Sequence, residues 1–443
     1  MPLDRKSRTG RAGPGMVLAA ILLLAGCIGG DIPSMLQFGK GRGPTDPAAG
    51  EAFAPQKEVD SSLIADLQAR RSILPEGGTY ARVADAVIAA SAGANAAELR
   101  VARLKAEARA KNWLPSIGPN VSLTSLGGVA ASLLLEQTVF DNGRNKAERA
   151  FAAADVELAA VGLSTEINGR VYSGLKYHLE AERARAQASV SANAAGRLAE
   201  FETVMGLRVE GGISDRSEQR VIAQQLAEMQ ATLAADHEAE TTARAELAAI
   251  AGGRIEGAAG LQPLPAVNFA ATEPLAVLQS RGEGARLLAE AKIQRAGLLP
   301  GISAVAGLGQ GGASPGLRLD GGGLGFGTRA SLQALDATGD VVDRQNAEAA
   351  ENANRRLVAL QRQIITLQSR EAEGAEVLRQ TAGNLDLFTE QYKVGRRTLL
   401  ELVGQYDSYA RLERDQISLK YDIALLQVEI ARDHGMLVDG ARM

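Results

Sequence analysis

Residues 392–403 read YKVGRRTLLELV, a short turn around Gly395 between two long stretches with helical periodicity. Most heptad positions from Leu357 to Phe388, on the preceding arm, are apolar. Most heptad positions from Leu402 to Asp433, on the following arm, are apolar as well. Apolar residues at this spacing lie along one face of a helix. The pattern predicts two helices that pack as an antiparallel coiled coil joined at Gly395.

The same plan occurs a second time, nearer the N-terminus. The first copy has a helix ending near Pro115, a strand-like pair, Phe140–Gly143, a long helix, a turn at residues 211–214 and a helix to about Ala251. The second copy has a helix ending near Pro300, a strand-like pair, Leu335–Gly339, a long helix, a turn at residues 395–398 and a helix to about His434. A repeat of whole units in the same order indicates a duplication. We predict repeats over residues 81–265 and 266–443.

The outgoing helix of the first copy is unusually long. It extends from about Gly143 to Arg208, which corresponds to about 100 Å if it is unbroken. Gly162, Gly169, Gly174 and Gly196 lie inside it, and each lowers the intrinsic helix stability by up to about 1 kcal/mol relative to alanine. Such a helix needs lateral neighbours, so the sequence favours an oligomer.

Between each proline and each long helix lies the strand-like part of its repeat. The first pair surrounds Val121, Leu123 and Leu133; the second contains Val305, Leu317, Leu319 and Phe326. A transmembrane β-strand needs only about nine to eleven residues. Two hairpins per chain therefore fit, and in an oligomer their strands could close into one barrel without a free edge. Both pairs lack the aromatic residues usually found at the two membrane interfaces.

The N-terminus has the features of an export signal. Several basic residues precede an apolar run from Met16 to Ala25, which is too short to span a membrane and ends in Leu-Ala-Gly-Cys27. This ending resembles the signal of bacterial lipoproteins, which implies cleavage before Cys27 and its acylation, including with palmitate. The alternative is a simple secretory signal that ends at a lone cysteine. We predict a signal peptide over residues 1–26 and a lipidated tether over residues 27–80, rich in Gly, Pro, Asp and Ser.

The composition and the motifs argue against an enzyme. The chain has a net charge of -4 and only 4% aromatic residues, and no basic block indicates a nucleic-acid partner. A literal G-x-G-x-x-G at Gly307 is not followed by a helix, so a dinucleotide site is not expected. His178, His237 and His434 lack the paired spacing of metal ligands. We expect no enzyme activity, no cofactor and no metal.

These features, duplicated and in this order, resemble the TolC-like outer membrane factors of bacterial efflux pumps and type I secretion systems. The resemblance covers nearly all of residues 81–437, and its most specific part is Phe388–Gly435. It implies a mainly α protein with a small β part, in which duplicated long helical hairpins form a trimeric α-barrel. Each chain would add two β-hairpins to a shared 12-stranded barrel in the outer membrane.

The function that the resemblance implies is a passive exit duct, anchored by lipid in the outer membrane and extending into the periplasm. Its partners would be two further copies of the chain, outer-membrane lipid, a periplasmic adaptor protein and an inner-membrane transporter of the RND or ABC type. Ile28 follows the lipidated cysteine, where an aspartate would suggest retention in the inner membrane. The alternative is a coiled-coil scaffold lipoprotein without a pore, which has no need of two glycine-rich strand pairs.

The resemblance also implies roles for individual residues. Tyr392, Arg397 and Glu401 match the pore constriction, in which Arg397 and Tyr392 hold the hairpin against neighbouring helices while Glu401 faces the threefold axis. A second acidic residue common in the family is replaced by Gly404. The two turns match the tips that dock the adaptor. Their residues are Arg208, Gly211, Gly212 and Ser214 in the first repeat and Val394, Gly395, Thr398 and Leu399 in the second.

Overall fold

The computed structural model describes residues 61–123, 129–253, 255, 257–265, 269–309, 312–321, 325 and 327–442. The signal peptide and Cys27 lie outside the described residues. The elements are α2 (Ser62–Ala69), α3 (Thr79–Ala89), α4 (Ala94–Ala110), β1 (Ser116–Leu123), β2 (Val129–Phe140), α5 (Arg144–Glu210), α6 (Arg216–Ile250), α7 (Leu275–Gly297), β3 (Gly301–Gly309), β4 (Gly312–Asp320), α8 (Thr328–Asp336), α9 (Thr338–Lys393) and α10 (Leu399–Asp433), with short 3₁₀ turns at Phe269–Ala271 and Gly440–Arg442.

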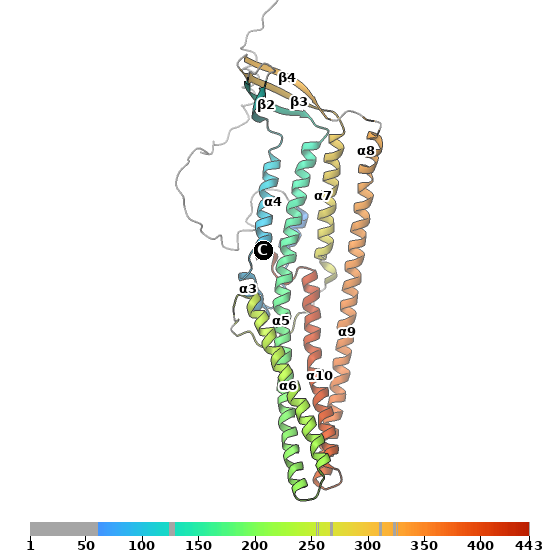
Figure 1. Ribbon diagram of the computed structural model, residues 1–443. Coiled ribbons are helices and arrows are strands. Elements are labelled where there is room, and N and C mark those ends of the chain that lie inside the picture. Colours follow the sequence, from blue (N-terminus) through green and yellow to red (C-terminus); the bar gives the residue numbers. More distant parts are fainter. Residues whose placement is uncertain are drawn as a thin grey trace, which may run out of the picture. The chain divides into compact units, whose positions relative to one another are not determined.

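Two long helical hairpins, α5–α6 and α9–α10, dominate the fold, as the sequence predicts. Helix α5 continues without interruption for 67 residues, which is about 100 Å. Asp215 caps the N-terminus of α6 and Thr398 caps that of α10 through side-chain oxygens. The two hairpin turns lie at the same end of the helices, and the strands lie at the opposite end (Figure 1).

Packing between the helices follows the predicted heptads. Every heptad position from Leu357 to Phe388 on α9 is at least partly buried, whereas most residues between them are exposed. Helix α10 contacts α9 on one side and α5 on the other, and α7 packs between α5 and α9. Gly174 on α5 allows a close approach, because a Cβ atom there would lie 2.7 Å from Val87 Cγ2 of α3. This glycine serves packing, although it weakens the isolated helix.

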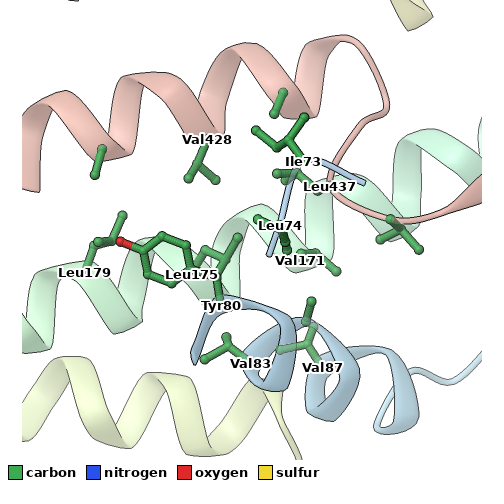
Figure 2. Packing of buried hydrophobic residues seen from close by; sticks show 14 of the residues in the cluster. Ile73, Leu74, Tyr80, Val83, Val87, Val171, Leu175, Leu179, Val428 and Leu437 are labelled. Carbon is green, nitrogen blue, oxygen red and sulfur yellow. The ribbon is translucent and has the colours of Figure 1, made fainter. Parts of the chain in front are cut away.

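The main apolar core joins the two repeats near the middle of α5. Val171, Leu175 and Leu179 of α5 face Val428 of α10 (Figure 2). The other labelled members of this cluster are Ile73, Leu74, Tyr80, Val83, Val87 and Leu437.

The expected tether boundary at residue 80 is wrong for its last part. Residues 62–69 form α2, and Ile73 and Leu74 are each only 5% exposed. Arg70 is buried as well, and its Nη1 donates to the carbonyl of His434 at 2.6 Å. The packed body therefore includes residues 61–80. Its short apolar groups have no sustained period, because they pack against the middle of α5 and the C-terminal end of α10 instead of forming a long helix.

The four strands form one antiparallel sheet with the order β1-β2-β3-β4. They contain 8, 12, 9 and 9 residues, close to the predicted lengths. The second strand-like pair is shorter than expected, since β4 ends at Asp320 and α8 begins at Thr328; Phe326 lies outside the described residues. Among the described helices, none has the length and hydropathy required to cross a membrane.

Candidate functional site

The turn of the second hairpin is held by local hydrogen bonds. Gly395 has a φ of 74°, a left-handed conformation that favours glycine. Thr398 Oγ1 accepts the backbone N–H of Glu401 at 3.2 Å, and Glu401 Oε2 accepts the backbone N–H of Thr398 at 2.9 Å. This reciprocal pair is a capping box, and it fixes Glu401 in the first turn of α10. The spacing Thr-x-x-Glu is the sequence signal of a capping box, and the sequence analysis did not use it.

Arg397 makes its contacts inside its own hairpin. Its Nη1 lies 2.7 Å from Glu401 Oε1, and its Nε donates to Gln391 Oε1 at 3.1 Å. Its guanidinium lies over the ring of Phe388, 4.6 Å from the centroid. In the described chain, Arg397 thus joins the end of α9 to the start of α10. The expectation that it ties the hairpin to other helices has no support in the structure of the single chain.

Glu401 is a paired carboxylate rather than a free one. The backbone N–H of Thr398 and then the Arg397 guanidinium hold the pKa of Glu401 below its usual value. The charge is therefore present throughout the neutral and mildly acidic range. Tyr392 packs against the apolar cluster of the tips, which includes Phe201 and Met205 of α5. Within one chain, Tyr392 is one of several residues that hold the second hairpin against the first through apolar contact.

The turn of the first hairpin also has a left-handed glycine and a side-chain N-cap, but each lies one residue later than the sequence match places it. Gly212, with a φ of 67°, is the left-handed glycine that corresponds to Gly395, whereas Gly211 is the C-cap with a φ of -79°. Asp215 takes the capping position of Thr398, and Glu218 takes that of Glu401. Arg208 Nε donates to Ser214 Oγ at 3.2 Å across the turn. The sequence match missed this register because the two tips share few identical residues.

The tips present apolar side chains to solvent. Leu207, Ile213 and Val394 are 64%, 69% and 68% exposed. Leu399 is only 2% exposed and belongs to the apolar cluster between the hairpins. The structure therefore brings together all the expected tip residues except Leu399, which is a core residue and cannot form part of an outer surface.

The sheet has one apolar face and one mainly polar face. In an antiparallel sheet, directly paired residues point to the same side. The register places these residues on the first face: Ile117, Pro119, Leu133, Leu135, Gln137, Phe140, Ile302, Ala304, Ala306, Leu308, Ala313, Pro315, Leu317 and Leu319. On the opposite face, Arg318 Nη1 lies 3.4 Å from Glu136 Oε2, and Ser303 donates to Asp320. Leu317 and Leu319 are 78% and 77% exposed, so the described part of the chain leaves this end of the apolar face uncovered.

The described residues contain no group of three or more His, Cys, Asp or Glu side chains placed to hold a metal ion. His178 and His434 are both buried, and burial lowers the pKa of each, so both are neutral near pH 7. Their contacts are with backbone carbonyls of Gly260 and Ile430. These histidines support the packing of the helices in the described chain.

Comparison with known proteins identifies the fold. No protein-family model matches the sequence, and no curated protein matches it. Solved structures do match. A membrane protein from Pseudomonas aeruginosa aligns with a TM-score of 0.72 at 15% identity, over 90% of this chain and 98% of that one. The outer membrane protein VceC of Vibrio cholerae aligns with a TM-score of 0.70 at 15% identity, over 81% and 96%.

The chain has the TolC-like outer membrane factor fold. The open state of the MtrE outer membrane channel of Neisseria gonorrhoeae also aligns, with a TM-score of 0.64 at 15% identity over 85% and 89% of the two chains. In each of these three cases the alignment covers most of both chains. The predicted architecture, long helical hairpins with a small β part, is confirmed. At this level of identity, the likeness defines the architecture and leaves function to be argued from the residues.

Proposed function

We propose that this protein is the outer-membrane exit duct of a tripartite efflux pump or type I secretion system. The observation that carries the proposal is the sheet, with its exposed apolar face opposite a mainly polar one. A membrane barrel needs this arrangement, because lipid lies outside it and water inside. A periplasmic scaffold without a pore, the alternative function, gives no reason for such a sheet at the end of two long hairpins.

The sheet is incomplete in one chain. Among the described strands, β1 and β4 are the edges, and each pairs on one side only. An open edge in hydrocarbon would leave backbone groups without partners, at several kcal/mol each. Three copies with four strands each would close a barrel of 12 strands, as the family resemblance implies. Exposed apolar residues of α9, including Val358 and Ile365, are suited to contact a neighbouring copy. Crosslinking in isolated membranes should therefore stop at the trimer.

The proposed route runs from the periplasm to the outside. Leu207, Ile213 and Val394 at the tips would contact a periplasmic adaptor, which links the duct to an RND or ABC transporter in the inner membrane. Arg216 and Arg220 lie in the first turns of α6, Arg396 lies in the second hairpin turn, and none of them makes an ion pair among the described residues. An adaptor surface that combines apolar and acidic side chains would suit this composition. The transporter would supply the energy, and the duct would stay passive.

The lipid anchor is part of this proposal. Cys27→Ser is expected to prevent acylation and to leave an unprocessed, longer precursor, because the cysteine thiol is the group that is lipidated. Metabolic labelling with radioactive palmitate, followed by gel electrophoresis, measures both effects. Equal labelling of the variant and the unaltered protein would exclude Cys27 as the acceptor. Ser34→Ala, in the expected tether, is a control that should label normally.

The constriction is also proposed to lie at the second tip. Arg397→Ser is expected to raise the resting conductance of reconstituted trimers, because the turn that carries the proposed constriction loses the pair with Glu401, the bond to Gln391 and the contact with Phe388, and is then less firmly held. Glu401→Ala should chiefly reduce the preference for cations. Since the pKa of Glu401 is below its usual value of 4.5, the preference should be equal at pH 7 and pH 5 and fall only in more acidic solution. Single-channel recording measures both properties.

Two results would oppose this assignment. If Arg397→Ser leaves the conductance unchanged and Glu401→Ala leaves the ion selectivity unchanged, the pore closes elsewhere. Arg396→Ser is the matched control, because Arg396 is the neighbouring arginine and makes no ion pair among the described residues. It should leave both the conductance and the selectivity as they are.

A further inference from the structure

The only tryptophan of the chain lies where helix α4 is followed by the sheet. Trp113 is 59% exposed and precedes the start of β1 at Ser116. Gln137 of β2 belongs to the apolar face of the sheet, and its Nε2 donates to the carbonyl oxygen of Trp113 at 2.7 Å. Phe140, the last residue of β2, lies on the same face and is 53% exposed. Trp113 therefore lies on the apolar side of the sheet, with a second aromatic residue at the same end.

These two aromatic residues lie at the helical end of the apolar face (Figure 1). On the other strands this face ends with Ile302 of β3 and Leu319 of β4. Tryptophan is enriched where the hydrocarbon of a membrane meets the headgroups, because its ring is apolar and its N–H group is polar. If the apolar face contacts lipid, Trp113 lies at the level of the headgroups on the periplasmic side.

Basic side chains gather at the same level. Asn112 Nδ2 donates to the carbonyl oxygen of Asn145 at 3.1 Å, and Arg149 Nη1 donates to Asn112 Oδ1 at 3.5 Å, so the end of α4 lies against the start of α5. The basic residues here are Arg109, Lys111, Arg144, Lys146 and Arg149, and the acidic ones are Glu107, Asp141 and Glu148. The excess is positive, although the whole chain has a net charge of -4. We call the five basic residues the basic collar.

The acidic residues do not neutralise the basic collar. Glu148 is shared, because its Oε2 lies 2.9 Å from Arg109 Nη1 and its Oε1 lies 3.1 Å from Arg144 Nε. Lys146 and Arg149 make no ion pair among the described residues, and Lys146 is exposed. Basic side chains close to a membrane surface attract anionic lipids. The basic collar thus has charge available for a partner outside the chain.

From this arrangement we infer that Trp113 and the basic collar bind anionic phospholipids in the periplasmic leaflet of the outer membrane; this inference rests on the proposed duct function, which places the sheet in that membrane. The indole ring would lie between the acyl chains and the headgroups, and the basic collar would contact the phosphodiester groups. A zwitterionic phospholipid has an ammonium group that cancels its phosphate charge. The surface should therefore select a lipid with a net negative charge, such as phosphatidylglycerol.

Trp113 can report its own lipid neighbours, because the chain has no other tryptophan. Trimers are reconstituted into phosphatidylcholine vesicles that contain an equal fraction of either brominated phosphatidylglycerol or brominated phosphatidylcholine. Bromine quenches indole fluorescence at close range. We expect a relative affinity at least about fivefold higher for phosphatidylglycerol. Salt at about 1 M should remove most of this difference, since it shortens the screening length to about 3 Å.

Lys146→Gln should lower the relative affinity for phosphatidylglycerol by roughly fivefold, because it removes one basic side chain beside Trp113. The matched control is Lys176→Gln. It removes the same charge from an exposed position on the same helix, about 45 Å from Lys146. That distance exceeds the screening length several times at physiological salt. Lys176→Gln should therefore show the same quenching as the unaltered protein.

Equal quenching by the two brominated lipids would overturn the inference and leave the duct function standing. An unchanged relative affinity in Lys146→Gln would show that the basic collar does not hold the headgroup. If neither brominated lipid quenches Trp113, the sheet does not lie in the membrane, and the proposed duct function fails together with the inference. Should Lys146→Gln not assemble, a preference of the unaltered protein that does not respond to salt would overturn the inference.

Discussion

Leu317→Arg should prevent the protein from accumulating as a trimer in the outer membrane. Leu317 is near the middle of β4, on the apolar face of the sheet, and is 78% exposed in the single chain. If this face contacts lipid, an arginine near the centre of the bilayer costs about 2–4 kcal/mol per chain. Each trimer would contain three such residues. Membrane fractionation followed by native gel electrophoresis measures the loss.

The opposite face of the same strand provides the control. Ser314 lies on the polar side of β4, where Arg318 already pairs with Glu136. Ser314→Arg should therefore assemble normally, because a charge on this side would face water. Equal assembly of Leu317→Arg and Ser314→Arg would mean that the apolar face does not contact lipid. The sheet would then have to pack against another protein surface.

Gly395→Val should abolish export while trimers remain intact. The φ of 74° at Gly395 is a conformation that a β-branched residue adopts only with a strain of about 1–3 kcal/mol. The turn would relieve this strain by changing shape, which displaces the exposed side chain of Val394. Gly212→Val should act in the same way on the first tip, where φ is 67°. Loss of the secretion or resistance phenotype in the native host measures the effect.

Gly211 makes a close control for the first tip. It precedes Gly212 directly, but its φ of -79° suits any residue. A Cβ atom there would lie 3.4 Å from the carbonyl oxygen of Leu207, an ordinary contact. Gly211→Ala should export normally. Normal export by both Gly212→Val and Gly395→Val would show that the tips are not the docking surface.

The long helices were predictable because their signals are local and repeated. Heptads on α9 and α10, and a glycine turn after each long arm, specify the hairpins from the sequence alone. The strand pairs were predictable from their length and from their position between a proline and a long helix. The contact of Ser191 and Arg414 with Asp236 was not predictable, because the three residues lie on three helices with no fixed sequence spacing between them. Residues 61–80 were missed for a similar reason, since their apolar side chains pack against helices that are distant in the sequence.

At the candidate site, sequence reasoning located the two hairpin turns and misjudged some contacts within them. It placed Glu401 at the tip, but the capping box with Thr398 gives this carboxylate a structural role that the family comparison did not reveal. It treated Leu399 as a surface residue, although the side chain of this first residue of α10 is buried in the core. It also paired Gly211 with Gly395, because residue types alone do not reveal which of two neighbouring glycines has a positive φ. Side-chain direction required the structure.

Single-channel recording in a planar lipid bilayer tests the central claim, that three copies of this chain form a continuous duct. Purified protein carrying Arg397→Ser is the best sample, because the unaltered trimer should be mostly closed without its partners. We predict discrete conductance steps of uniform size, and none from the Leu317→Arg variant. Absence of steps from assembled, membrane-inserted Arg397→Ser trimers would contradict a duct and would favour a scaffold without a pore.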